Sequence, residues 1–231
     1  MDGPESPNVQ RLSMRRIAEQ VFQVLNLERG LGYTLKKLAL SPGKAMREYL
    51  FEDRRHHMKP FQFLLFTVAI ATFISVWALP QPDELVADLH KNPQWAEMSE
   101  GLQVALTWLI TNMQQYFNVF YLLGLPFTAL ASYFIFRSAR LNYAEHLVIN
   151  AYIVGFQTIF YIIFLPFLLQ YTWVGFVQII CIFGYNIYAY KMVFEESWPM
   201  GALKTIAVFV VAQWMLGFLY ILSIGGFVLF Y

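Results

Sequence analysis

The sequence predicts an all-α, polytopic membrane protein with five transmembrane helices and an N-terminal amphipathic helical arm in the cytoplasm. Three observations lead to this fold class. Residues 60–79 contain no charged side chain and follow directly on a segment rich in Lys and Arg. The chain of 231 residues is 58% hydrophobic and only 13% charged, which is unlike a soluble domain of this size. Four further apolar stretches follow the first one.

The length of each apolar stretch is sufficient to cross a bilayer. Residues 61–79 reach about 29 Å as a helix, close to the hydrocarbon thickness, and Pro80 and Pro82 are expected to end this first span. The other spans are expected at residues 117–136, 147–169, 173–194 and 202–230. We therefore predict two domains, a basic cytoplasmic arm over residues 1–59 and a five-helix transmembrane domain over residues 60–231.

The segment before the second span carries its own apolar helical face, between Leu102 and Met113. Two arrangements fit this pattern. The segment either lies along the outer membrane boundary or extends the second span outward.

The distribution of Lys and Arg predicts the orientation of the chain. Eleven of the 16 Lys and Arg lie in residues 1–60, whereas residues 80–116 contain only Lys91. Arg137 and Arg140 follow the second span, and Lys191 and Lys204 flank the turn before the last one. This alternation places the N-terminus in the cytoplasm and the C-terminus outside. No cleavable signal peptide is expected, so the first span would act as the anchor.

Within the arm, an apolar helical face at residues 17–28 is expected to end at Gly30 and Gly32. A second helix is predicted from Ser41 and Pro42 to about Met58. One stripe of this second helix is basic, with Phe51 as an aromatic member. Its cations, which are candidate ligands of anionic lipid head groups, are Lys44, Arg47, Arg54 and Arg55. The alternative is that these cations only set the topology.

The third span carries a polar face, because several of its polar residues lie on one side of a helix that turns by about 100° per residue. The fourth span adds two further polar residues. The candidate residues of this polar bundle face are Glu145, His146, Asn150, Gln157, Tyr161, Gln178 and Asn186. They either join helices through hydrogen bonds or line a polar path. We expect Glu145 and His146 to face inward, near Arg54 or Arg55.

Motifs for catalysis or metal binding are weak. Glu52 and Asp53 precede His56 and His57 by four residues, but only Glu145 and His146 could complete such a metal site, and no metal is predicted. No nucleotide-binding loop or HExxH motif occurs, so no cofactor is predicted. An intramembrane enzyme that uses Glu145 and His146 as acid and base is a remaining alternative.

Two classes of partner or cross-link are also disfavoured. Cys181 is the only cysteine, which excludes an intrachain disulfide. No nucleic-acid-binding module is recognisable in the basic arm, so no nucleic acid partner is expected.

Two motifs resemble those of the bacterial domain-of-unknown-function family 3667. The first lies in TLKKLALSPGKAMREYLFEDRRHHMKPFQFLLF and the second is the Tyr-x-Glu-His element of LNYAEHLVINAYIVG. The positions that match are Thr34, Leu38, Pro42, Tyr49, Leu50, Arg54, Pro60, Tyr143, Glu145 and His146. The resemblance covers about residues 30–231 and implies a polytopic bacterial membrane protein without an established activity. Unlike many members, this sequence has no cysteine-rich zinc ribbon ahead of the arm.

These observations predict a non-catalytic scaffold, sensor or assembly partner in the bacterial inner membrane, with a periplasmic C-terminus. Membrane lipids, a second copy of the chain or another membrane protein are the expected partners. The alternative is a small transporter, channel or lipid-handling protein that uses the polar face of the third span.

The topology can be tested with reporter fusions. A reporter that is active only outside the cytoplasm should be active after Tyr231 and inactive after Arg140, because five spans place these positions on opposite sides of the membrane. Reporter activity would be compared at matched expression levels. An inactive reporter after Tyr231 would contradict the five-span count.

Overall fold

The computed structural model describes residues 27–80, 82–168 and 170–230, and no strand occurs in these ranges. The predicted all-α class is therefore confirmed. The helical elements are α2 (Leu27–Leu40), α3 (Pro42–Arg47), the π-helical turn η1 (Glu48–Glu52), α4 (Pro60–Ala78), α5 (Pro82–His90), α6 (Pro93–Glu97), α7 (Glu100–Ile135), the 3₁₀ turn η2 (Arg137–Ala139), α8 (Tyr143–Leu168), α9 (Trp173–Phe194) and α10 (Trp198–Phe230).

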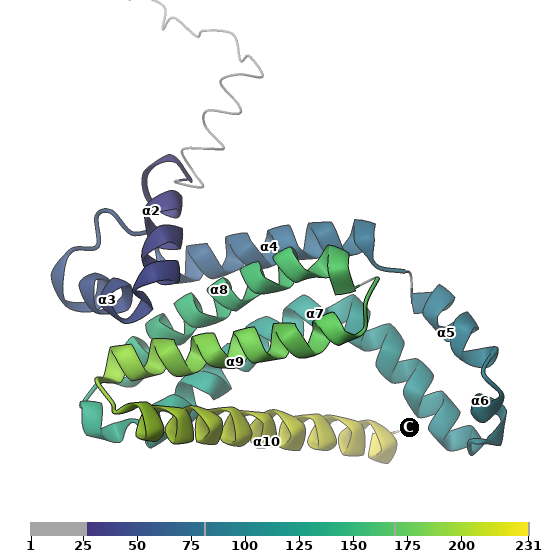
Figure 1. Ribbon diagram of the computed structural model, residues 1–231. Coiled ribbons are helices and arrows are strands. Elements are labelled where there is room, and N and C mark those ends of the chain that lie inside the picture. Colours follow the sequence, from purple (N-terminus) through teal and green to yellow (C-terminus); the bar gives the residue numbers. More distant parts are fainter. Residues whose placement is uncertain (1–26, 81, 169, 231) are drawn as a thin grey trace, which may run out of the picture.

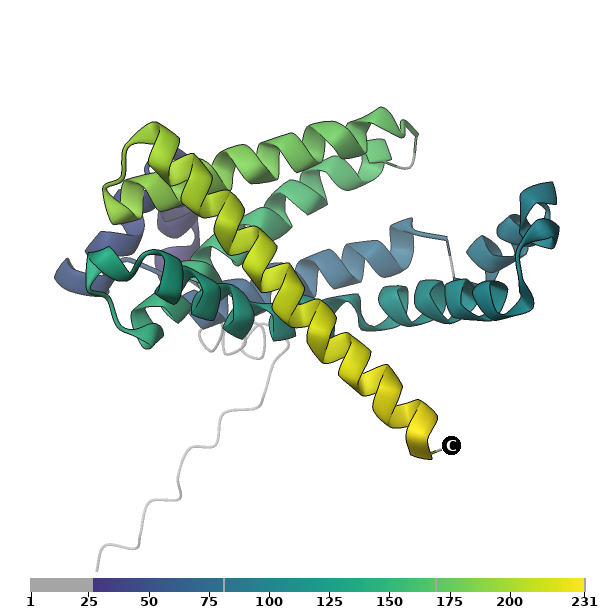
Figure 2. The same cartoon turned by 90° about the horizontal axis from the view of Figure 1, so that it is seen from below.

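The long helices lie alongside one another, and the shorter helices gather at the two ends of the bundle (Figure 1). Helices α2 and α3, the α7–α8 turn and the α9–α10 turn are at one end. Helices α5 and α6 and the α8–α9 turn are at the other end. Seen from below, α10 crosses the other long helices obliquely (Figure 2).

Four helical segments are long and apolar enough to cross a membrane: α4, α8, α9 and the part of α10 from Trp198 to Phe218. They support integration of the chain in a membrane. The apolar stretch of α7 within the described residues, Leu122–Ile135, is shorter. Four of the five expected spans thus have the required length and composition, and a span in α7 stays a prediction.

Helix α7 is continuous over 36 residues, with Pro126 inside it. The segment before the expected second span therefore extends that helix outward, as one of the two arrangements proposed. Helices α5 and α6 precede it, and the Gln103 side-chain amide of α7 donates to the carbonyl oxygens of Trp95 (2.8 Å) and Met98 (3.1 Å). These bonds hold the short helices against the first turns of α7.

Helix α8 is the central helix, since it packs against α4, α7 and α9. Its buried side chains include Ile149, Tyr152 and Ile153, each no more than 1% exposed. At Gly155 the helix approaches α4 so closely that an added Cβ atom would lie 2.8 Å from the ring of Phe63. A side chain at position 155 would push the two helices apart.

One prediction about the arm is wrong because a glycine is needed for close packing. Gly30 and Gly32 do not break the helix but lie within α2. A Cβ atom on Gly30 would lie 2.7 Å from the backbone nitrogen of Met58. Gly30 thus allows α2 to contact the chain just before α4. The apolar face expected at residues 17–28 lies almost wholly outside the described residues.

The second helix of the arm also ends earlier than predicted, at Glu52 rather than near Met58. The backbone of Asp53 is extended, at φ −130° and ψ 119°, because the chain must turn here to reach α4. The guanidinium of Arg54 donates to the carbonyl oxygens of Tyr49 (2.9 Å) and Leu50 (3.2 Å). Arg54 therefore satisfies carbonyl groups that the end of the helix leaves open.

The two glycines of α2 form a matched pair for a stability test. Gly32→Ala should raise stability by up to about 1 kcal/mol, because alanine favours the helix and nothing lies within 4 Å of the added Cβ atom. Gly30→Ala should lower stability, because the new atom collides with backbone. Thermal unfolding of the full chain in detergent measures both effects. Equal shifts for both variants would contradict the close contact at Gly30.

Candidate functional site

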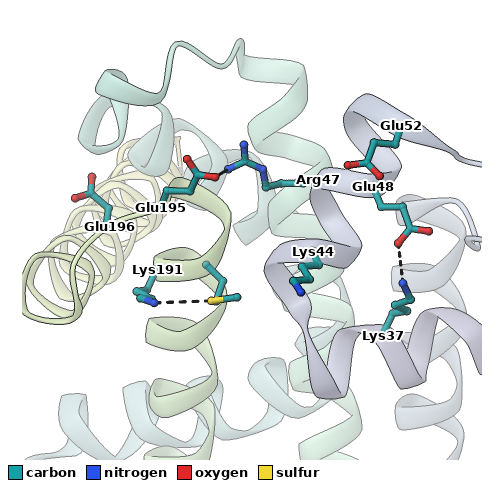
Figure 3. Close-up of a pocket in the computed structure, with 9 residues that line it drawn as sticks. Lys37, Lys44, Arg47, Glu48, Glu52, Lys191, Glu195 and Glu196 are labelled. Carbon is teal, nitrogen blue, oxygen red and sulfur yellow. Dashed lines mark hydrogen bonds and ion pairs between the residues drawn. The ribbon is translucent and has the colours of Figure 1, made fainter.

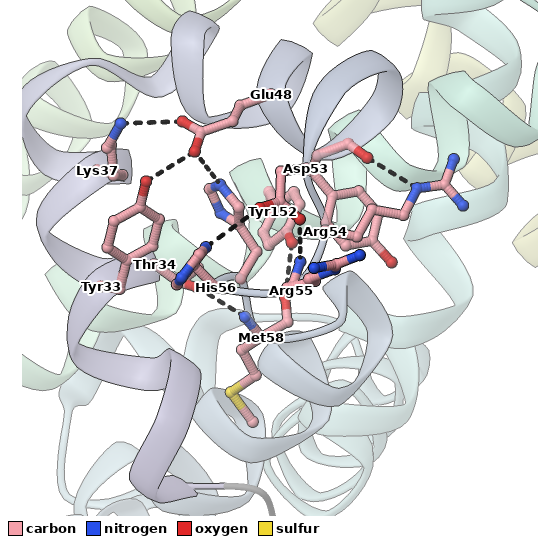
Figure 4. A network of polar contacts seen from close by, with 12 residues as sticks. Tyr33, Thr34, Lys37, Glu48, Asp53, Arg54, Arg55, His56, Met58 and Tyr152 are labelled. Carbon is pink, nitrogen blue, oxygen red and sulfur yellow. Dashed lines mark hydrogen bonds and ion pairs between the residues drawn. The ribbon is translucent and has the colours of Figure 1, made fainter.

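The strongest cluster of polar contacts joins the arm to the bundle. We define the arm junction as Tyr33, Thr34, Lys37, Glu48, His57 and Met58 of the arm together with Tyr152 of α8. Figure 4 shows that the labelled members of this set come together from α2, η1, the loop before α4, and α8. The junction lies at the end of the bundle that sequence analysis assigns to the cytoplasm.

Glu48 is the charged centre of the arm junction. Its carboxylate accepts hydrogen bonds from the Tyr33 hydroxyl (2.7 Å) and the Lys37 ammonium (2.9 Å). These two bonds, with that of Lys37 the stronger, lower the pKa of Glu48 from 4.5 to about 2. The side chain of Glu48 is 19% exposed, so this ion pair is partly shielded from water. Glu48 therefore stays ionised and fixes η1 to α2.

His57 is the buried titratable group of the junction, with a side chain that is 0% exposed. Its Nε2 atom lies 3.5 Å from Oε1 of Glu48, and its ring meets Tyr33 edge to face at 5.0 Å. Burial lowers the pKa of His57, although the charge of Glu48 acts in the opposite direction. The neutral ring is therefore the form that the folded arm favours.

The backbone of Met58 connects the arm to α8. Its N–H donates to the hydroxyl of Thr34 at 2.8 Å, and its carbonyl oxygen accepts from the hydroxyl of Tyr152 at 2.6 Å. Thr34 and Met58 are buried, and Tyr152 is 1% exposed. The ring of Tyr49 packs edge to face against the ring of Tyr152, with 5.5 Å between the ring centroids. Both backbone polar atoms of the buried residue Met58 are thus satisfied by side chains from two different helices.

Several residues of the first family motif form contacts within the arm or between the arm and the bundle. Thr34, Tyr49 and Arg54 take part as described above. Leu38 is 0% exposed, and its carbonyl oxygen accepts from the Tyr185 hydroxyl of α9 at 3.3 Å. Pro42 begins α3 and is buried. The motif thus describes how the arm docks. Sequence reasoning missed Tyr152, because a tyrosine within an apolar span gives no sign of its partner.

Part of the predicted polar face of α8 forms a hydrogen-bonded cluster with α7 and α9. The side chain of His146 lies 2.9 Å from the Ser132 hydroxyl through Nδ1. The Asn150 amide donates to Ser132 (2.9 Å) and accepts from the Tyr190 hydroxyl (2.6 Å). Ser132, His146 and Asn150 are each no more than 1% exposed. The cluster therefore links three helices inside the bundle.

Further along α8 the polar residues pair with other helices. The Gln157 amide donates to Asn186 of α9 at 2.7 Å. The hydroxyl of Tyr161 lies 2.9 Å from that of Ser75 in α4. Gln178 is half-buried on α9. Sequence analysis named both Gln157 and Asn186 but missed Ser75, Ser132 and Tyr190, since the helical period does not reveal which neighbouring helix packs against a face.

The expected inward position of Glu145 near an arginine of the arm is wrong. The Glu145 carboxylate accepts from the backbone N–H of Asn142 at 2.7 Å, and the Asn142 side chain accepts from the N–H of Glu145 at 3.0 Å. These reciprocal bonds cap the start of α8. Because its carboxylate caps the N-terminus of α8, Glu145 stays at the end of the helix. Of the two residues, only His146 points into the bundle.

The four candidate lipid-binding cations have different surroundings. Arg47 pairs with Glu195 at 2.5 Å and donates to the carbonyl oxygen of Val193 at 3.3 Å, so it caps the end of α9. Arg54 caps η1, whereas Lys44 and Arg55 are exposed. The expected common stripe does not form, since Arg54 and Arg55 lie beyond the helix. Their binding to lipid stays a prediction.

The acidic and histidine residues of the arm do not gather into a metal centre. His56 lies 3.3 Å from Asp53, and their side chains are 68% and 46% exposed. Within the described residues, no group of three or more His, Cys, Asp or Glu side chains could hold a metal ion.

Comparison with known proteins identifies one family. The model of the family described as "Protein of unknown function (DUF3667)" matches residues 28–72, which run from α2 to the middle of α4. The match confirms the resemblance predicted from the first motif, and it covers less than half of the chain. No curated protein and no solved structure matches the chain.

The buried His57 makes the stability of the folded chain depend on pH. Its pKa is lowered on folding, so stability is complete above the unfolded value of 6.5 and falls as the pH falls below it. Thermal unfolding of the full chain should show this loss below about pH 6.5, and His57→Phe should reduce the slope. Glu48 loses its contribution only at lower pH, between 4.5 and about 2. An unchanged slope in His57→Phe would contradict this assignment.

Proposed function

We propose that this protein is a non-catalytic scaffold of the bacterial inner membrane, in which a helix bundle holds a docked cytoplasmic arm. The observation that carries the proposal is the pairing of the polar residues of α8 with neighbouring helices. His146, Asn150, Gln157 and Tyr161 each contact a polar side chain of α4, α7 or α9. Such contacts serve to join helices in a membrane.

The docked arm supports the same role. A chain that only inserts in a membrane needs no partly shielded ion pair and no buried, hydrogen-bonded backbone ahead of its first span. Here the segment matched by the family model is packed on α8 and α9 through the arm junction and Arg47. We infer that the arm presents a fixed surface at the cytoplasmic side to a second copy or to another membrane protein.

The proposed orientation is supported by the arrangement of the ends. The arm and the turns that carry Arg137, Arg140 and Lys191 lie at one end of the bundle, opposite α5 and α6 (Figure 1). Cations concentrate on the cytoplasmic side of membrane proteins. The N-terminus is thus assigned to the cytoplasm and, with α7 as the fifth span, the C-terminus to the periplasm.

One observation favours the alternative of a small transporter or lipid-handling protein. The Nε2 atom of His146 is buried without a hydrogen-bond partner among the described residues. A buried polar atom of this kind is expected to have a partner, and water in a polar path would supply it. The two functions therefore differ in whether water reaches the polar face of α8.

Cysteine accessibility distinguishes a dry scaffold from a polar path. In a Cys181→Ser background, a cysteine at Gln157 or Tyr161 should resist a membrane-impermeant maleimide applied from either side. The physical reason is that Asn186 and Ser75 occupy the polar contacts of these positions. Labelling is measured by the mass shift of the intact chain in proteoliposomes.

Lys59→Cys in the same background is the positive control, since Lys59 is exposed just before α4. It should react from one side of the membrane only. Rapid labelling at position 157 or 161, comparable to that of the control, would reject the scaffold proposal in favour of a water-filled path.

A further inference from the structure

A pocket of about 610 Å³ lies between the arm and the end of α9. Its lining residues come from α2, α3, η1, α9 and the turn before α10 (Figure 3), and they are Lys37, Lys44, Arg47, Glu48, Glu52, Lys191, Met192, Glu195 and Glu196. The pocket is open to the surface and is separate from the polar face of α8. It combines apolar and charged groups, as a binding site for an amphipathic molecule would.

Most charges in this pocket are already paired. Lys37 binds Glu48, Arg47 binds Glu195, and Glu196 binds Lys204. Among the described residues, the ammonium groups of Lys44 and Lys191 have no carboxylate partner. Glu52 also lines the pocket and has no ion-pair partner among the described residues. The unpaired groups are therefore two cations from two different helices and one carboxylate, which leaves one positive charge without compensation.

Close backbone contacts hold these two lysines in place. Next to Lys44, Gly43 packs so tightly on α9 that an added Cβ atom would lie 2.3 Å from Cβ of Met192. On the other side, a Cβ atom on Gly201 of α10 would lie 3.0 Å from Cβ of Lys191. The separation of the two lysine backbones is thus fixed by glycine contacts, so the pocket does not depend on a flexible loop.

The pocket also lies at the depth where lipid head groups are expected. It opens beside the last turn of α9 and the first turn of α10, both of which belong to segments able to cross a membrane. Tyr188 and Trp198 stack there at 6.4 Å, Trp198 is 57% exposed, and the ammonium of Lys191 lies 5.0 Å from its ring. Exposed Trp and Tyr side chains mark the membrane–water boundary.

We propose that this pocket binds the phosphate group of a membrane phospholipid between Lys44 and Lys191. A phosphate diester carries the negative charge that the two ammonium groups lack, and lysine is a common ligand of phosphate. The acyl chains would leave along the apolar surface of α9 and α10. The site is distinct from the scaffold proposal, which concerns the inner face of α8 and does not depend on bound lipid.

Native mass spectrometry of the full chain, released from detergent in the presence of phosphatidylglycerol or phosphatidylethanolamine, tests the site. The wild type should retain a bound lipid. The double variant Lys44→Met and Lys191→Met, which keeps the apolar stems, should retain roughly 30-fold less, because each of the two lysines near a head group contributes about 1 kcal/mol. Retention by the double variant equal to that of the wild type would overturn the proposal.

A matched control removes the same charge elsewhere on the arm. Lys36→Met with Lys59→Met should retain lipid like the wild type, since both lysines are exposed and neither lines the pocket. An equal loss in both double variants would show a general effect of charge and would also overturn the site. Lys44→Arg with Lys191→Arg should restore retention.

Two further measurements complete the test. If the double methionine variant fails to fold, Lys44→Met alone is used, because this exposed side chain can be changed without disturbing the bundle. Inorganic phosphate is then added as a competitor. Displacement of the lipid as the phosphate concentration rises would support recognition of the phosphate group, and retention that no concentration of phosphate reduces would overturn it.

Discussion

The contact of the arm with α8 depends on the backbone polar atoms of Met58. The buried N–H and carbonyl oxygen of this residue, which belong to two consecutive peptide groups, each need a partner, because an unsatisfied polar group away from water is costly. Thr34 supplies the first partner from α2 and Tyr152 supplies the second from α8. Removal of either side chain would leave one backbone polar atom of Met58 without this partner. The start of α4, two residues later, is thereby fixed as well.

Buried polar groups inside the bundle are likewise satisfied by side chains of neighbouring helices. Ser132 accepts from Asn150 and lies beside His146, so that one hydroxyl serves two side chains of α8. Phe194 stacks on His146 at 5.3 Å and on Phe136 at 4.0 Å, which surrounds the cluster with aromatic rings. The hydrogen bonds of this cluster are directional, whereas dispersion contacts between apolar surfaces are not. The cluster therefore helps to fix the positions of α7, α8 and α9 relative to one another.

Sequence analysis was sufficient for the helical class and for four of the apolar spans, and it named His146 and Asn150, which are buried in the bundle. These features depend on composition and on the helical period, which are local properties. It failed at Gly30, Glu145 and the end of the second arm helix. At Gly30 the deciding contact comes from Met58, and at Glu145 from the cap with Asn142. The partners Ser75, Ser132, Tyr152 and Tyr190 were missed because they depend on which helices become neighbours.

The turn after α9 couples the arm to the direction of α10. Glu195 has φ 55°, in the left-handed region that costs a residue other than glycine about 1–2 kcal/mol. Its carboxylate is held by Arg47 of α3, and three residues later α10 begins. The close packing of Gly201 on Lys191 holds the start of α10 against α9. Docking of the arm adds one polar contact at the turn from which the last helix begins, and an undocked arm would leave Glu195 without that contact.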